Sequence, residues 1–270
     1  MSDSRLVKGT FLLTAATMIS RVLGLLYYFP FIWLVGIQGA ALYAYAYNPY
    51  VVLLSIATVG LPLAVSKFVS KYNALGDYKT GRRLFYSGII VMLGTGFATF
   101  LILFLSAEAI APMFIGEGDA TGNSLEDVAF VIRVVSFALL VVPVMSLIRG
   151  YFQGFNSMGP TAVSQVVEQL VRIAFILLSS FIIVIVLKGE RTTAVAFAVF
   201  AAYVGALGGL AVLLWYWRKR KPHLDKLVQE STVEHDISLF SMYKELLSYA
   251  IPFVIVGLAI PIYQQIDTLT

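Results

Sequence analysis

Long apolar runs separated by short polar segments dominate the chain. Each run has about 18 or more residues and few charges, which is the length that a helix needs to cross the hydrocarbon core of a bilayer. The runs are too long and too continuously apolar to be the alternating strands of a membrane barrel. The pattern therefore predicts an all-α integral membrane protein, with spanning helices at residues 9–36, 41–69, 83–107, 126–150, 159–187, 192–217 and 244–270.

The composition agrees with this pattern. Hydrophobic residues make up 59% of the chain and charged residues only 13%, whereas a soluble domain is about half apolar and a quarter charged. The chain has no cysteine, which excludes disulfides, thiol catalysis and cysteine-bound metal. Its two histidines, His223 and His235, both fall in one polar loop. With no catalytic triad, zinc-binding helix or phosphate loop, we expect neither an enzyme nor a cofactor.

Basic residues sort to one side of the predicted helices. Only Lys188 and Arg191 lie on the other side, where the loop before residue 126 is acidic. By the positive-inside rule, the N-terminus is expected to be cytoplasmic. The basic ends suit contact with anionic lipid headgroups, and no soluble basic domain favours nucleic acid. The residues on the basic side are Arg5, Lys8, Lys67, Lys71, Lys79, Arg82, Arg83, Arg149, Arg218, Lys219, Arg220, Lys221, Lys226 and Lys244.

The predicted organisation has three parts. Residues 1–217 form an N-terminal transmembrane lobe, residues 218–243 a cytoplasmic loop, and residues 244–270 a seventh helix that is cut short by the end of the sequence. Apolar residues recur through the loop, which fits an amphipathic helix lying on the membrane surface. A solvated linker is the alternative. The unfinished last span indicates a fragment of a longer chain.

Polar residues inside the first span form one stripe. Thr10, Thr14, Thr17, Arg21, Gly24 and Tyr28 follow each other at intervals of three or four, which places them on one helix face. Helix packing alone explains the small and hydroxyl residues. It does not explain Arg21, because a charge at membrane depth costs at least about 2.5–3.5 kcal/mol and usually faces a bundle interior or wet cavity.

The fifth span repeats the pattern. Thr161, Gln165, Glu168 and Arg172 share a face, and Glu168 precedes Arg172 by four residues, the favourable order for a helical ion pair. The pair is either structural or part of a cavity for substrate or ions. Both residues are therefore candidate cavity residues with Arg21.

Four further residues are candidates for the same cavity, and two for its inner end. Prolines precede Gln264 and Asp267 and free backbone carbonyls, as at transporter binding sites; Asp267 at the interface is the alternative. Arg133 lies near the outer side, where outward snorkelling is the alternative. Asn48 belongs to a span bent by Pro49 and Pro62. The cavity candidates are Arg21, Arg172, Glu168, Arg133, Gln264, Asp267 and Asn48, and the candidates for an inner gate or lipid phosphate site are Arg149 and Gln153.

Three stretches carry a family resemblance: ISRVLG at residues 19–24, LPLAVSKFVSKYNALGDYKTGRRLF at 61–85 and RGYFQGFNSMGPTAVSQVVEQLVRI at 149–173. They resemble the polysaccharide-transport branch of the multidrug/oligosaccharidyl-lipid/polysaccharide exporter superfamily, in particular lipid II flippases and the stage V sporulation protein B type. The resemblance implies two six-helix lobes around a central cavity, with two additional helices. This chain then supplies the N-terminal lobe and helix 7.

The resemblance also implies a function. The family moves an undecaprenyl-pyrophosphate-linked glycan, lipid II, from the inner to the outer leaflet of the bacterial plasma membrane. Arg21 matches the arginine of the family's first helix. Membrane lipids and the cell-wall synthesis machinery are the implied partners, and the membrane potential, Na⁺ or H⁺ is the expected energy source. The alternatives are export of another lipid-linked polysaccharide, a multidrug or cation antiporter, and a non-transporting scaffold.

Overall fold

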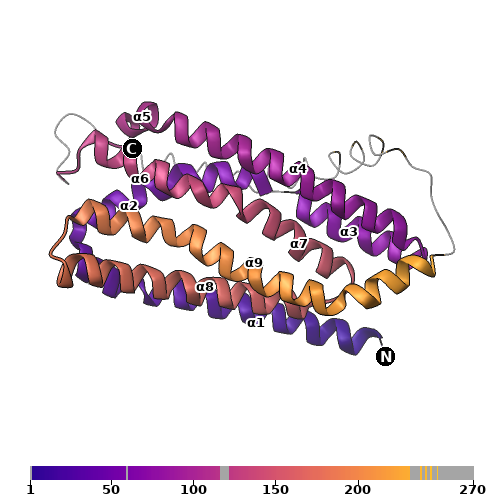
Figure 1. The fold of residues 1–270 in the computed structure, drawn as a ribbon. Coiled ribbons are helices and arrows are strands. Elements are labelled where there is room, and N and C mark those ends of the chain that lie inside the picture. Colours follow the sequence, from indigo (N-terminus) through magenta and orange to yellow (C-terminus); the bar gives the residue numbers. More distant parts are fainter. Residues whose placement is uncertain are drawn as a thin grey trace.

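The computed structural model describes residues 2–58, 60–115 and 122–231, together with Ser238, Ser241, Lys244 and Ser248. Long helices lie side by side in this part of the chain, and it contains no strand (Figure 1). The all-α prediction is confirmed. The elements are α1 (Ser2–Leu26), α2 (Tyr28–Thr58), α3 (Leu61–Ala74), α4 (Tyr78–Leu105), α5 (Ala107–Ile110), η1 (Ala111–Met113), α6 (Leu125–Ser136), η2 (Phe137–Leu140), α7 (Val142–Gly154), α8 (Met158–Phe181), η3 (Ile182–Val186) and α9 (Arg191–Gln229).

Six helical stretches in the described residues are long and apolar enough to cross a membrane. They correspond in order to the first six predicted spans, whereas residues 251–270 of the seventh lie outside the described residues. The six stretches are Val7–Leu26, Tyr28–Ala74, Tyr78–Leu105, Leu125–Gly154, Met158–Val186 and Arg191–Gln229.

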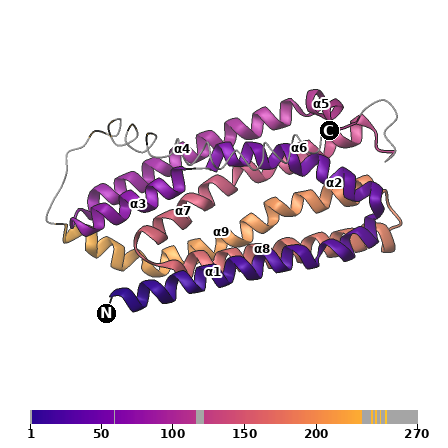
Figure 2. The same cartoon turned by 180° about the vertical axis from the view of Figure 1, so that it is seen from behind.

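The turn between the first two spans lies at Gly36. Helical hydrogen bonding passes through Tyr27, whose amide donates to the Leu23 carbonyl at 3.2 Å. The helix then breaks at Gly36, where φ is 74° and ψ is 179°. This region of backbone space is essentially restricted to glycine. The chain reverses there, so that α2 runs back against the direction of α1 (Figure 2).

The second span is bent as its prolines predict. Gly60 has a φ of 89° between α2 and α3, and Pro62 stands in the first turn of α3. A missing amide proton is harmless in a first turn, because that proton has no partner within the helix. Pro49 lies inside α2.

The helix of the sixth span continues past residue 217. The helix α9 continues to Gln229 and has 39 residues, so it is about 58 Å long, well beyond the ~30 Å of a hydrocarbon core. Packing holds the extension in place. Arg82 on α4 pairs with Asp225, and Leu224 is buried. Residues 218–229 therefore continue α9 as one helix, and most of 232–243 lies outside the described residues. The prediction of a cytoplasmic segment over 218–243 stays a prediction.

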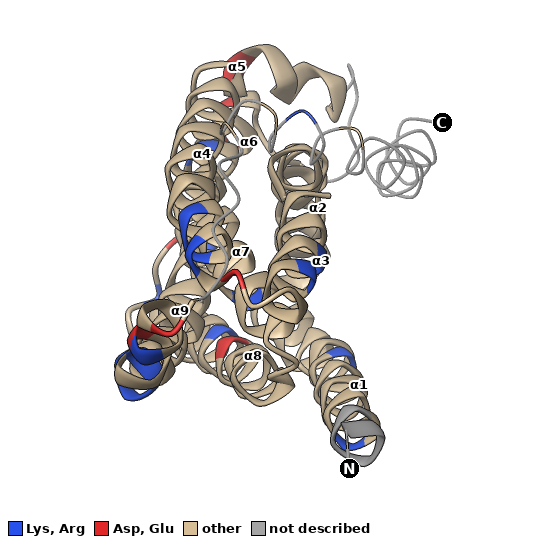
Figure 3. Ribbon diagram, turned by 90° about the vertical axis from the view of Figure 1, so that its right-hand side faces the viewer, with Lys and Arg blue, Asp and Glu red and all other residues tan. Residues whose placement is uncertain are grey.

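Basic side chains gather at one end of the described bundle. Figure 3 looks along the bundle from the end that carries the α3–α4 turn and shows Lys and Arg on α1, α3, α4 and α9. This placement agrees with the predicted sorting of basic residues. Two buried apolar clusters hold the helices together. One involves mainly α2, α6 and α9, and the other mainly α3, α4 and α7.

Candidate functional site

A polar pocket lies where α1 packs along α8. The two helices are in direct contact: the Thr17 hydroxyl donates to Gln165 Oε1 at 3.4 Å. A Cβ on Gly24 would lie only 3.3 Å from the Gln169 amide nitrogen. The pocket has a volume of about 260 Å³ and is lined only by polar side chains: Thr17, Ser20, Arg21, Arg149, Gln165, Glu168 and Gln169.

Glu168 is the centre of an ion-pair network beside this pocket. Its Oε2 accepts from Arg149 Nη2 at 2.8 Å, and its Oε1 accepts from Arg172 Nη2 at 2.8 Å. The three side chains are only 14–16% exposed. One carboxylate therefore neutralises one of two arginines, and the network keeps a net positive charge.

Ser164 fixes the orientation of Arg149. Its buried hydroxyl accepts from Arg149 Nε at 3.1 Å and from Nη2 at 2.7 Å, and it donates to the Gly209 carbonyl at 3.1 Å. The planar guanidinium group of arginine carries five N–H donors. Ser164 and Glu168 occupy the donors on Nε and Nη2. Nη1 has no hydrogen bond to any residue that the structure describes.

Arg172 is directed into the lobe. Its Nη1 donates to the Tyr47 hydroxyl on α2 at 3.3 Å, and Tyr47 stacks on Tyr43 with ring centroids 5.4 Å apart. Arg172 does not line the polar pocket. Arg172 therefore contacts Glu168 from the protein interior, whereas Arg149 contacts it from the pocket.

Arg21 contributes a second cation to the pocket. Its side chain is exposed, and it makes no hydrogen bond or ion pair with the described residues. The pocket thus contains two arginines and one carboxylate. The polar stripe of the first span divides here: Thr17, Arg21 and Gly24 lie beside α8 residues of the pocket, whereas Thr10 and Thr14 do not line it.

The structure brings Arg21, Glu168, Arg172 and Arg149 together and leaves other candidates apart. Arg133 Nη2 pairs with Glu108 Oε1 at 2.6 Å near the far end of the bundle, over the ring of Phe104. Asn48 on α2 and Gln153 on α7 are half-buried and do not line the pocket. Gln264 and Asp267 lie outside the described residues.

Sequence reasoning missed three members of this site. Ser164 precedes Glu168 by four residues, so a helical-face argument was sufficient to find it. The same argument applies to Ser20, three residues after Thr17, and to Gln169, four residues after Gln165. The described residues contain no group of His, Cys, Asp and Glu suited to a metal ion.

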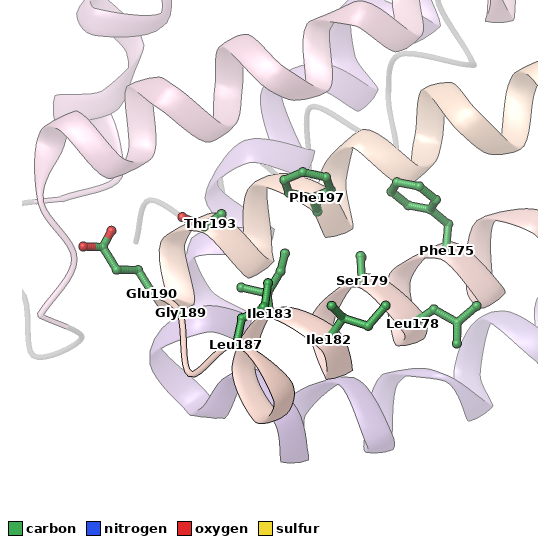
Figure 4. Close-up of a pocket in the computed structure, with 10 residues that line it drawn as sticks. All are labelled: Phe175, Leu178, Ser179, Ile182, Ile183, Leu187, Gly189, Glu190, Thr193 and Phe197. Carbon is green, nitrogen blue, oxygen red and sulfur yellow. The ribbon is translucent and has the colours of Figure 1, made fainter.

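A second cavity is apolar and has no lining residue in common with the polar pocket. It has a volume of about 560 Å³ and lies between the ends of α8 and α9. Figure 4 shows apolar side chains from α8, η3 and α9 around it, with Glu190 at one end. These walls offer few polar groups, in contrast to the pocket that contains Arg21 and Glu168.

The fold matches about half of each of two solved structures. A multidrug/oligosaccharidyl-lipid/polysaccharide superfamily transporter from Pyrococcus furiosus superposes with a TM-score of 0.67 over 93% of this chain and 52% of its own, at 16% identity. A MATE transporter in complex with MaD3S gives 0.68 over 93% and 53%, at 18% identity. At these identities the likeness establishes the fold.

Sequence comparison identifies the family. The model of the polysaccharide biosynthesis protein family matches residues 6–270, so the chain belongs to that family. It is 53% identical to the lipid II flippase MurJ of Bacillus subtilis (strain 168), over 99% of this chain and 49% of that protein. It is 29% identical to stage V sporulation protein B of the same organism, over 82% of this chain and 40% of that protein. The chain spans about half the length of MurJ, and it is a multi-pass membrane protein.

Proposed function

We propose that the full-length protein is a flippase that moves lipid II from the inner to the outer leaflet of the bacterial plasma membrane for peptidoglycan synthesis. The observation that carries the proposal is the Arg21 guanidinium, which has no partner among the described residues and lies in a polar pocket with Arg149 and Glu168. The 53% identity to a lipid II flippase over nearly the whole chain supports it.

The depth of the pocket fits this task. Arg21 lies 14 residues from the start of its apolar stretch at Val7, which is about 21 Å along the helix. A polar headgroup that crosses the bilayer alone loses water without gaining other partners, at a cost of several kcal/mol per group. Arginine replaces those partners for a phosphate, because its planar fork stays charged and donates two parallel hydrogen bonds.

In the proposed cycle the headgroup enters a cavity that opens to the cytoplasm, and Arg21 binds its pyrophosphate. Glu168 holds Arg149 and Arg172 while the pocket is empty. The two lobes then rock to open the cavity on the outer side. The N-terminus is cytoplasmic in this scheme, as the basic residues favour. The membrane potential supplies about 2.3 kcal/mol per charge per 100 mV, and Na⁺ or H⁺ are the other candidate energy sources.

Three rival functions make different predictions. A multidrug or cation antiporter favours a pocket dominated by acids and aromatic rings, and the excess of arginine here is unfavourable for an organic cation. A flippase for another lipid-linked polysaccharide uses the same phosphate chemistry with a different glycan. A non-transporting scaffold, for example one that organises cell-wall enzymes, requires no charge at Arg21.

The test uses the full-length protein in cells depleted of their own lipid II flippase. Lipid II at the outer surface is labelled in cells that express wild type, Arg21→Ala, Arg21→Lys or the matched control Lys226→Ala, whose residue is exposed. We expect wild type and the control to restore surface lipid II, Arg21→Ala to fail and Arg21→Lys to restore part of it. Correctly inserted wild type that fails to rescue rules out lipid II. Full rescue by Arg21→Ala rules out the role of Arg21.

A further inference from the structure

We infer that Arg149 is the second arm of a clamp for a lipid-linked diphosphate, with Arg21 as the first arm and Ser164 as the residue that positions Arg149. This inference rests on the proposed function, because it assigns a chemical class of substrate to the same pocket. Sequence reasoning had placed Arg149 at an inner gate or lipid phosphate site. In the structure Arg149 lies in the wall of the pocket that contains Arg21.

The first argument is the arrangement of donors on Arg149. Ser164 and Glu168 take up Nε and Nη2, with distances of 3.1, 2.7 and 2.8 Å. These contacts fix the plane of the guanidinium and leave the two protons of Nη1 without a partner among the described residues. A planar donor held on one side and free on the other is preorganised for an anion.

The second argument is the support behind Ser164. Its hydroxyl is fully buried and donates to the Gly209 carbonyl of α9 at 3.1 Å, so its lone pairs are directed to Arg149. A Cβ on Gly209 would lie 3.3 Å from Arg149 Nη2 and 3.2 Å from the Glu168 Cβ. Three helices, α7, α8 and α9, therefore determine where this guanidinium lies.

The third argument is charge. Arg21 and Arg149 come from α1 and α7 and line one pocket, whose only acid, Glu168, also pairs with Arg172 outside the pocket. A single phosphate satisfies one guanidinium fork. Two linked phosphates pair with both arginines, one with the Arg21 fork and the other with the free Nη1 protons of Arg149, and each charge-assisted pair adds binding free energy. The pocket is about 260 Å³ in volume, so it takes the phosphates of the headgroup, and the glycan lies beyond it.

The experiment measures selectivity on purified full-length protein. The affinities of a short prenyl diphosphate and of the prenyl monophosphate with the same chain are compared by calorimetry, with inorganic diphosphate as a third probe. We expect wild type to prefer the prenyl diphosphate over the monophosphate by about tenfold, the effect of one additional charge-assisted pair. Arg149→Lys, which keeps the charge beside Glu168, and Ser164→Ala are expected to reduce the preference to about twofold or less. The control Lys226→Ala keeps it.

The ratio separates a clamp from structural damage. Damage to the fold lowers both affinities together, whereas loss of the second arm lowers only that for the diphosphate. A wild-type ratio near one, or an equal loss for both probes in Arg149→Lys, overturns the inference. Equal affinity for inorganic and prenyl diphosphate overturns the assignment to a lipid. If the purified protein prefers the prenyl diphosphate but fails to restore surface lipid II in cells, the proposed function is wrong. The clamp then binds a different diphosphate-linked lipid.

Discussion

Glu168 and Arg149 are joined by a 2.8 Å ion pair, although they are 19 residues apart and lie on different helices. Glu168 also pairs with Arg172 one turn along its own helix. A single carboxylate thus connects α7 to α8 and, through Arg172 and Tyr47, to α2. The site that we propose to bind phosphate is therefore also part of the internal packing of the lobe.

Glu168→Gln is expected to destabilise the full-length protein. The substitution keeps the shape but leaves Arg149 and Arg172 as half-buried cations without a counter-charge, and breaking such a pair costs about 3–5 kcal/mol. Thermal unfolding in detergent measures the effect. The matched control is Glu230→Gln, because Glu230 pairs with Lys226 at 3.7 Å while both side chains are more than half exposed, and such pairs contribute under about 1 kcal/mol. Equal melting temperatures for the two variants would contradict the prediction.

Gly205→Ala is expected to disturb the same network from α9. A Cβ at Gly205 would lie 2.9 Å from both the Arg172 Cβ and the Glu168 carbonyl oxygen, so α8 and α9 must move apart. Overpacking of this kind costs about 1–3 kcal/mol. Gly94→Ala is the control, since a Cβ there has no neighbour within 4 Å and alanine is the better helix former by about 1 kcal/mol. We expect unfolding at a lower temperature for Gly205→Ala and at an unchanged or higher one for Gly94→Ala.

The sequence predicted the helices better than their ends. Spans follow from apolar length alone, so the first six were found. The end of α9 was missed because Arg218, Lys219, Arg220 and Lys221 suggest a membrane boundary, whereas a helix continues wherever neighbours pack against it. Residues 218–229 are held by the Arg82–Asp225 pair. These two residues are 143 positions apart in the sequence, so no local pattern reveals the contact.

The site was predicted in part for the same reason. Arg21, Glu168 and Arg172 each belong to a polar face that can be recognised from the sequence of a single helix. The role of Arg149 depends on how α7 meets α8 and α9, which is a property of the packed lobe. Arg133 is also an arginine within an apolar span, yet its partner is Glu108 at the end of the bundle away from the α3–α4 turn. Residue type and depth alone did not distinguish the two arginines.

Gly36→Ala is expected to weaken the reversal between the first two spans. A side chain at φ 74° and ψ 179° is strained, at about 1–3 kcal/mol. Gly159→Ala is a suitable control, because its Cβ has no neighbour within 4 Å and its φ lies outside the glycine region. Protease resistance of the inserted protein reports the effect. If both variants resist digestion as wild type does, the turn tolerates a side chain and the backbone argument fails.

Asp225→Ala is expected to loosen the end of α9. The substitution removes the partner of Arg82, whose side chain is 17% exposed, while Leu224 and the Ser231 contact to the Gly76 carbonyl at 3.1 Å remain. Because Asp225 is itself 38% exposed, the loss is modest, about 1 kcal/mol. Hydrogen exchange of residues 218–229 measures it, and we expect roughly fivefold faster exchange there with no change in α8. Lys226→Ala, one residue along and facing solvent, should leave the rate unchanged. A uniform rise over both helices would instead show that the pair stabilises the whole lobe, and would contradict a local role for this contact.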